Sequence, residues 1–128
     1  MFQQPEVLRM AQGMAVHAAA RQQAIAANIA NADTPGYRAR DLAPFADSLD
    51  RPDQTLTATR AGHLMQPDEA RGPAFPAEDR GTAAAPNGNT VAIEVEMAAA
   101  VDARRQHDQA LAIYRASLTL LRSALGKG

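Results

Sequence analysis

Residues 21–41 read RQQAIAANIANADTPGYRARD, and this stretch sets the layout of the chain because it contains a helix end followed by a turn. Asn28, Asn31 and Asp33 compete with the helix for backbone hydrogen bonds, so a helix running into this stretch is expected to end near Asn31. Pro35-Gly36 suits the centre of a type II turn, whose second central residue needs a positive φ. The sequence therefore predicts a helix, a sharp turn and a change of direction.

The segment before this turn is predicted to be one helix from Pro5 to about Asn31. Pro5 suits the first helical position, where its missing N–H costs nothing, and Glu6 complements the positive end of the helix dipole. Apolar and small residues recur at spacings of three and four, which is the pattern of a coiled-coil seam. These seam positions are Leu8, Ala11, Ala15, Ala18, Gln22, Ile25 and Ile29.

A second, longer helix is predicted from about Val91 to Leu125. The run Asn87-Gly88-Asn89-Thr90 supplies a turn and a helix cap. Glu94 and Glu96 lie near the start of this helix, where the dipole favours acidic groups. Its predicted seam comprises Ile93, Met97, Ala100, Arg104, His107, Leu111, Tyr114, Leu118, Leu121 and Leu125.

The composition limits how well such a chain can fold alone. Of the 128 residues, 30 are Ala and only 29 are larger apolar residues. Alanine favours helix but buries little area, while each ordered residue costs about 1–2 kcal/mol of backbone entropy. We therefore expect the chain to obtain part of its order from neighbouring subunits.

The fold class predicted is mainly α, with two long terminal helices forming an antiparallel, coiled-coil-like pair. The predicted divisions are a helix at 1–34, an irregular Pro- and Gly-rich middle at 35–88, and a helix at 89–128. At most a short strand or hairpin is expected in the middle, with Thr55–Thr59 as a candidate strand. Loop or disorder is predicted from Gln66 to Ala85.

No chemistry-bearing cluster emerges from the sequence. His17, His63 and His107 are widely separated and Cys is absent, so no catalytic, cofactor or metal site is predicted. Each of the three histidines is expected to be solvated or to lie at an interface. A net charge of −1 gives little attraction for nucleic acid, and no apolar stretch reaches the roughly 18 residues that span a bilayer. A cleavable secretory signal is not expected either.

Polar residues interrupt both predicted seams. Gln22, Arg104 and His107 occupy positions where an isolated coiled coil would place apolar groups. Two interpretations stay open: these side chains are solvated, or they contact polar groups of a neighbouring subunit and fix its register.

One motif is distinctive. The run N-I-A-N-A-D-T-P-G-Y-R-A-R-D at 28–41 resembles the N-terminal signature of the bacterial flagellar rod and hook axial proteins. Asn87-Gly88-Asn89-Thr90-Val91, with Glu94 and Glu96-Met97 after it, resembles the start of the same family's C-terminal helix. Thr59-Arg60 with His63-Leu64 is weakly similar to a further element. The motif residues carried over are Asn28, Asn31, Asp33, Thr34, Pro35, Gly36 and Tyr37.

The resemblance implies a structural subunit of the proximal rod of the flagellar basal body, without enzymatic activity. It implies that the terminal helices pack as an antiparallel pair and that subunits stack into an axial tube in the periplasm. The implied partners are copies of the chain, the rod proteins FlgC and FlgF, the adaptor FliE, the membrane ring, and the flagellar type III apparatus that exports the chain without signal cleavage.

Two questions about function stay open at this stage. A purely local role of the turn and a direct contact with a neighbour both fit the motif, and Tyr37 is the residue expected to reach a partner. The alternatives to the proximal rod are another short rod subunit of the family, or a soluble helical adaptor or export chaperone.

Overall fold

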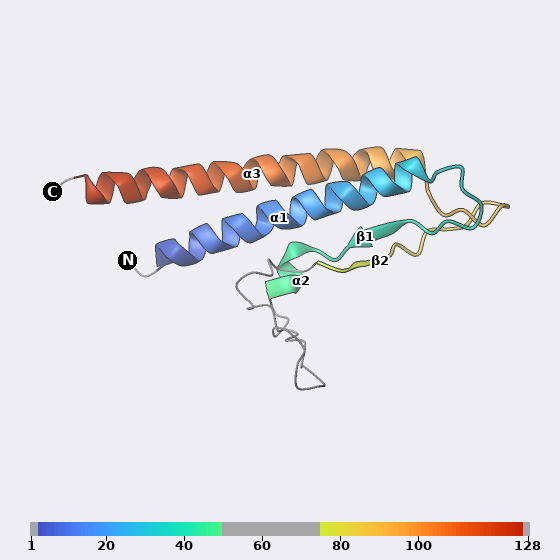
Figure 1. Cartoon of the computed structure of the whole chain (residues 1–128), viewed down its shortest axis with the longest axis horizontal. Helices are drawn as coiled ribbons and strands as arrows, with labels where there is room; N and C mark the ends of the chain where they lie inside the picture. Colours follow the sequence, from blue (N-terminus) through green and yellow to red (C-terminus); the bar gives the residue numbers. More distant parts are fainter. Residues whose placement is uncertain (1–2, 50–74, 127–128) are drawn as a thin grey trace, which may run out of the picture.

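A computed structural model describes residues 3–49 and 75–126 of the chain (Figure 1). The candidate strand Thr55–Thr59, the stretch Thr59–Leu64 and the first part of the predicted loop from Gln66 lie outside these residues. The elements in chain order are α1 (Gln3–Ala30), β1 (Arg40–Leu42), α2 (Phe45–Leu49), β2 (Ala77–Asp79) and α3 (Ile93–Leu125).

Two long helices dominate the described residues. α1 and α3 lie side by side and run in opposite directions, so the start of α1 and the end of α3 lie at the same end of the molecule (Figure 1). The predicted mainly helical fold with one long helix near each terminus is confirmed. We call the end of the pair where α1 finishes and α3 begins the closed end. The opposite end, where α1 begins and α3 finishes, is the open end.

The predicted turn follows α1 directly. Gly36 has a φ of +73°, and the Tyr37 N–H donates to the Thr34 carbonyl at 3.2 Å, as a type II turn requires. A second glycine, Gly88, has a φ of +83° and lies against Gly36: a Cβ added at Gly88 would be 3.3 Å from the Gly36 Cα. Glycine is favoured at both positions because the backbone is left-handed, and at Gly88 also because the Gly36 backbone lies close by.

The middle of the chain contributes a two-stranded arm. β1 and β2 pair antiparallel, with Arg40 opposite Asp79 and Leu42 opposite Ala77, and β1 contacts α1. This pairing confirms a short hairpin-like element, and it corrects the prediction that the whole stretch up to Ala85 is loop or disorder. Periodicity could not indicate β2, because the strand has three residues and all of them are exposed.

The faces that α1 and α3 bury are lined mostly by small side chains. Ile25, Ala99 and Ala103 form the core cluster. Ala11 and Ala18 on α1, and Ala110 on α3, are also buried. Because alanine permits close approach of two helix backbones, the helices pack through these residues rather than through their larger apolar ones.

The buried stripe of α3 corrects the predicted seam. The buried residues of α3 are Glu96, Ala99, Ala103, Ala110 and Ser117, which is one position before the predicted seam at each step. Ile93, Met97, Tyr114 and Leu125 of that seam are exposed, as is Ile29 on α1. The remaining large seam residues, Leu8, Leu111, Leu118 and Leu121, are half-buried, as is Ala15. The predicted seam followed the large apolar residues of the sequence. The residues actually buried between the helices are mostly alanines, each one position earlier in the chain.

Candidate functional site

The signature residue Asn28 is the centre of a buried polar cluster. Its side-chain N–H groups donate to the Arg40 carbonyl at 2.7 Å and to a Glu96 carboxylate oxygen at 3.1 Å. Its side-chain oxygen accepts from the Arg40 N–H at 3.0 Å and from the Tyr37 hydroxyl at 3.4 Å. A side-chain amide has two donors and two acceptor positions, so Asn28 is fully satisfied and joins α1, β1 and α3.

Glu96 places a carboxylate in the interface between the two long helices. It is 0% exposed, and it pairs with Arg80, which follows β2. Burying an unpaired carboxylate is very costly, so this arginine and Asn28 are what make the position tolerable. The arm therefore supplies the counter-charge for a residue inside the helix pair.

Asp41 on β1 extends the cluster toward α1. It accepts two hydrogen bonds from Arg21, at 2.9 and 3.1 Å, and a third from Arg80 at 3.1 Å. Burial acts to raise the pKa of Asp41, but the hydrogen bonds from Arg21 and the Leu42 N–H, with the two arginine charges, hold that pKa below its ordinary value. The bond to Asp41 likewise raises the pKa of Arg21.

These contacts form one continuous chain of alternating charge, Arg21–Asp41–Arg80–Glu96, that ends on Asn28. We call these five residues the polar junction. It lies toward the closed end of the helix pair and ties α1, both strands and α3 together. Two positive and two negative charges balance within it.

A second set of contacts closes the loops beyond the junction. Asn89 donates to the carbonyls of Asn31 at 2.9 Å and Thr34 at 2.8 Å, and the Thr90 hydroxyl accepts from the Ala39 N–H at 2.7 Å. The prediction that the run Asn87–Thr90 caps the second helix is wrong. The N-cap is Ala92, which has no side-chain cap bond, and Asn89 instead clamps the turn after α1.

The other motif residues serve the turn itself. Asn31 donates to the Ala27 carbonyl and accepts from the Thr34 hydroxyl. Asp33, Pro35 and Gly36 are exposed, and Tyr37 is half-buried. The Tyr37 hydroxyl donates within the chain to Asn28, so the expectation that Tyr37 reaches a partner stays a prediction.

The residues that interrupt the predicted seams are not members of the polar junction. Gln22 and His107 are half-buried. Arg104 is exposed and pairs with Asp108 one turn later on the same helix at 3.4 Å. An exposed pair of this kind contributes little to stability. A role of these three residues in contacts between subunits stays a prediction.

Of the two histidines that the structure describes, His17 and His107, the environment of His17 differs from expectation. The sequence favoured a solvated or interface position, but His17 is buried and its Nε2 lies 2.7 Å from the Ala43 carbonyl. Its ring packs against Phe45 and meets Phe75 edge-on, with centroids 4.8 Å apart. It therefore docks the arm on α1.

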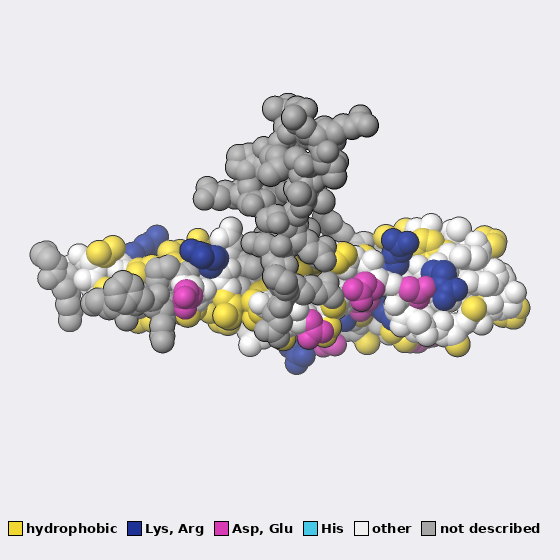
Figure 2. Space-filling view, turned by 90° about the horizontal axis from the view of Figure 1, so that it is seen from below, with side chains coloured by type: hydrophobic (Ala, Val, Ile, Leu, Met, Phe, Trp, Pro, Cys, Tyr) yellow, Lys and Arg dark blue, Asp and Glu magenta, His cyan; other side chains and the backbone are white. Residues whose placement is uncertain are grey.

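The outer surface carries the large apolar residues that the interface does not use. Met97 is 61% exposed and Val101 is 68% exposed on α3. Figure 2, seen from the side of the arm, shows hydrophobic side chains along the elongated body with charges of both signs among them. The exposed large apolar residues of the two long helices are Val7, Met10, Val16, Ile29, Ile93, Val95, Met97, Val101, Ile113, Tyr114, Leu120 and Leu125.

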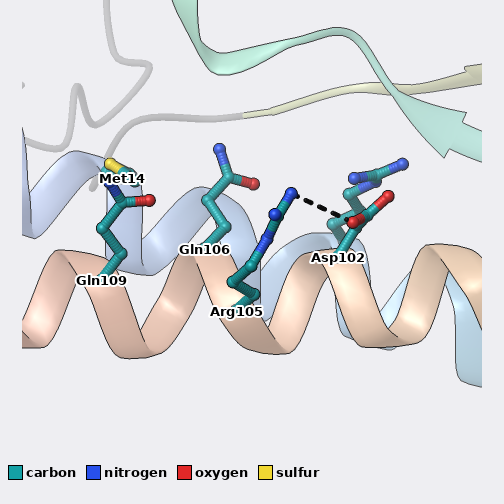
Figure 3. Close-up of a pocket in the computed structure, with 6 residues that line it drawn as sticks. Met14, Asp102, Arg105, Gln106 and Gln109 are labelled. Atoms are coloured by element: carbon teal, nitrogen blue, oxygen red, sulfur yellow. Dashed lines mark hydrogen bonds and ion pairs between the residues drawn. The ribbon is translucent and has the colours of Figure 1, made fainter.

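The hollows between the helices are open grooves. One, of about 290 Å³, is lined by Met14 and otherwise by polar side chains, and Arg105 reaches Asp102 across one turn of α3 (Figure 3). The other, of about 200 Å³, is lined by small and apolar residues near the open end: Ala11, Gln12, Ala15, Ala110, Leu111 and Tyr114. Neither gathers a nucleophile with a base. Among the described residues, no group of three or more metal-binding side chains occurs and none of the helices could cross a bilayer.

Sequence reasoning named Asn28, Glu96 and Asp41 but did not connect them. Glu96 precedes Ala99 and Ala103 at helical spacing, so its carboxylate lies on the same face of α3 as these small residues. This spacing is the signal from which the position of Glu96 could have been inferred. No sequence signal indicated Arg80, which is 16 residues away in a segment without periodicity.

The N-terminal part of the chain is similar to known proteins. Residues 8–38, which cover most of α1 and the turn, match the family of flagella basal body rod proteins. The predicted resemblance is thereby confirmed over that stretch.

The particular relatives are FlgB proteins. The flagellar basal body rod protein FlgB of Escherichia coli K12 is 68% identical over 31 residues, which is 24% of this chain and 22% of that protein. The FlgB proteins of Shigella flexneri and Salmonella typhimurium match with the same identity and coverage. The matched stretch thus spans about a fifth of the length of these relatives.

Proposed function

We propose that this protein is a structural subunit of the proximal rod of the bacterial flagellar basal body. The observation that carries the proposal is the 68% identity to FlgB over 31 residues, together with the family match at residues 8–38, which hold most of α1 and the signature turn. In this role the chain polymerises into the axial shaft that transmits torque from the membrane ring toward the hook. It acts by packing and carries out no catalysis.

The distribution of apolar residues supports a role in assembly. Small residues fill the contact between α1 and α3, while a dozen large apolar side chains of the two helices stay exposed. Surfaces of this kind are typical of subunits that bury them against neighbours. In the proposed rod, the antiparallel pair acts as a coiled-coil-like unit of the axial core, and repeated heterologous contacts build a helical tube.

The proposed partners are copies of the chain, FlgC and FlgF as rod neighbours, and FliE and the membrane ring at the cell-proximal end. The proposed location is the periplasmic part of the basal body, reached through the flagellar type III apparatus without signal cleavage. Residues 1–34 and 89–128 contribute the core helices, and residues 35–88 form the segment that joins them.

Deletion and structural localisation in the source bacterium test the proposal. The gene is deleted, the full chain is restored from a plasmid, and basal bodies are purified for electron microscopy. We expect the deletion strain to lack the rod and not to swim, and the restored strain to show density for α1 and α3 in the proximal rod. A matched control restores the chain with Glu94→Gln, an exposed change that should leave motility intact.

Two results would contradict this function. A deletion strain that builds a complete rod would show that the chain is dispensable for the shaft. A chain that rescues motility but is missing from purified basal bodies would instead indicate an adaptor or export chaperone.

A further inference from the structure

The contact between α1 and α3 has a repeat that leaves its register weakly defined. On α3 the buried positions Glu96, Ala103, Ala110 and Ser117 are spaced by seven residues, and on α1 so are Ala11, Ala18 and Ile25. A slide of one helix by seven residues, about 10 Å, would therefore bring small side chains opposite small side chains again. Alanines alone distinguish poorly between these registers.

Ile25 does not resolve this ambiguity. It packs between Ala99 and Ala103. After a slide by one heptad it would face Gln106 and Ala110, of which Ala110 is also a small buried residue. The apolar part of the interface thus tolerates more than one alignment of the helices.

The polar residues of the interface do define the register, because each of them has its hydrogen-bond partner at one position only. Asn28 meets Glu96 only in the observed register, and both side chains are fully buried. A slide by one heptad would separate them and would draw Glu96 away from Arg80, leaving buried polar groups without partners. Asn89 adds a second restraint through its bonds to the Asn31 and Thr34 carbonyls.

We propose that the Asn28–Glu96–Arg80 contact, reinforced by Asn89, sets the axial register of α1 against α3. This is a positioning role: the contact selects one alignment of an interface that the alanines leave open. The carboxylate favours this alignment over the one in which Ile25 would face Gln106 and Ala110, because that slide takes Glu96 away from Asn28 and Arg80.

The register matters because the outer surface is composed of residues from both helices. Val16 on α1 and Val101 on α3 are exposed apolar residues whose relative position depends on the alignment. A slip of one heptad would displace one set by about 10 Å along the other. Any surface that neighbouring molecules recognise across both helices would then be lost.

Distance measurement between spin labels tests the proposal in the full-length chain. The chain has no cysteine, so labels can be attached at Gln23→Cys on α1 and Ala112→Cys on α3, both exposed positions. The test variant combines Glu96→Leu with Arg80→Met, which removes both charges together. Replacing a buried ion pair by apolar residues of similar size is often tolerated, so helix content should persist.

The control makes the same two kinds of change outside the junction, at Glu94→Leu and Arg38→Met. Glu94 is exposed on the first turn of α3, and Arg38 is exposed and pairs with Asp79. We expect the unaltered chain and the control to give one narrow distance. The test variant should add a second, distinct distance that corresponds to an axial slide of about 10 Å, and adding Asn89→Ala should enlarge this second population.

Three results would overturn the proposal. One narrow distance in the test variant, equal to that of the unaltered chain, would show that packing alone sets the register. A broad distribution in the unaltered chain would show that the contact does not fix it. Loss of helix in the test variant, measured by circular dichroism, would make the contact a condition for folding rather than for alignment.

Discussion

The two ends of the helix pair are held by different kinds of interaction. At the closed end, Asn28, Arg80 and Glu96 exchange directed, charged hydrogen bonds in a buried setting. Toward the open end, Ala11 and Ala110 are buried among small and half-exposed side chains, and one open groove separates the helices there. Directed bonds specify one arrangement, whereas alanine contacts supply only modest burial. The closed end should therefore be the better ordered part of the isolated chain, and the open end the part that benefits most from neighbours.

The largest effect is expected from removing the counter-charge at the closed end. Arg80→Met leaves Glu96 buried beside Asn28 without a positive partner, which should lower the free energy of unfolding by about 3–5 kcal/mol. Urea unfolding followed by circular dichroism measures this loss. The control is Arg38→Met, whose pairing with Asp79 is exposed and screened, so little change is expected. Equal losses in the two variants would remove the distinction between the buried junction and the surface.

A smaller effect is expected from Ile25, a large apolar side chain that is buried between the helices. Ile25 is 2% exposed and packs against Ala99 and Ala103, so Ile25→Ala should cost about 2–4 kcal/mol through the lost burial and the cavity. Ile29→Ala, one turn later and exposed, is the matched control and should cost much less. The same urea titration compares them. If both substitutions lower the free energy of unfolding equally, Ile25 is not the main apolar contact between α1 and α3.

The sequence was sufficient to predict both long helices and the turn between them. Periodic apolar residues, Pro5 at a helix start and Pro35-Gly36 at a turn each act locally, so their effects can be inferred without knowing what they pack against. The observed helices begin and end within two residues of the predicted bounds, Pro5–Asn31 and Val91–Leu125.

The junction could not be predicted because its contacts are not local. Arg80 and Glu96 meet only when the arm folds back on the helices, and Asp41 joins them from another strand. The α3 stripe was misplaced by one residue because the pattern weighted Met97 and Leu125 above the alanines. His17 was misjudged since its partners, Phe45 and Phe75, lie 28 and 58 residues away.

Acid should weaken the closed end before it affects the alanine contacts. The pKa of Asp41 is lowered in the folded chain: burial opposes this, but the bonds from Arg21 and Leu42 and the charges of Arg21 and Arg80 prevail. As the pH falls, the unfolded chain therefore takes up this proton first. The stabilisation is complete above the ordinary carboxyl pKa of 3.8 and is lost as the pH falls through the lower folded-state value.

The corresponding measurement is the urea midpoint between about pH 6 and about pH 2, in the unaltered chain and in Asp41→Asn. The variant should be less stable at neutral pH and should depend less on pH in the acid range. Some dependence should persist, because the Gly81 N–H and Arg38 also lower the pKa of Asp79. A variant that retains the full acid dependence would place the responsible carboxyl elsewhere.

The smallest effect on stability is expected on the outer face. Val101 is 68% exposed, so Val101→Ser should change the free energy of unfolding by no more than about 0.5 kcal/mol. If this face is covered by neighbouring subunits, the same variant should reduce swimming in soft agar when it replaces the chromosomal copy. Glu94→Ser, exposed on the same helix, controls for a polar substitution on α3 as such. Normal swimming of the Val101 variant would remove this part of α3 from the assembly surface, while a large loss of stability would show that Val101 packs within the chain. Unchanged stability with impaired swimming would separate the inner contacts, which fold the chain, from the outer ones, which join it to others.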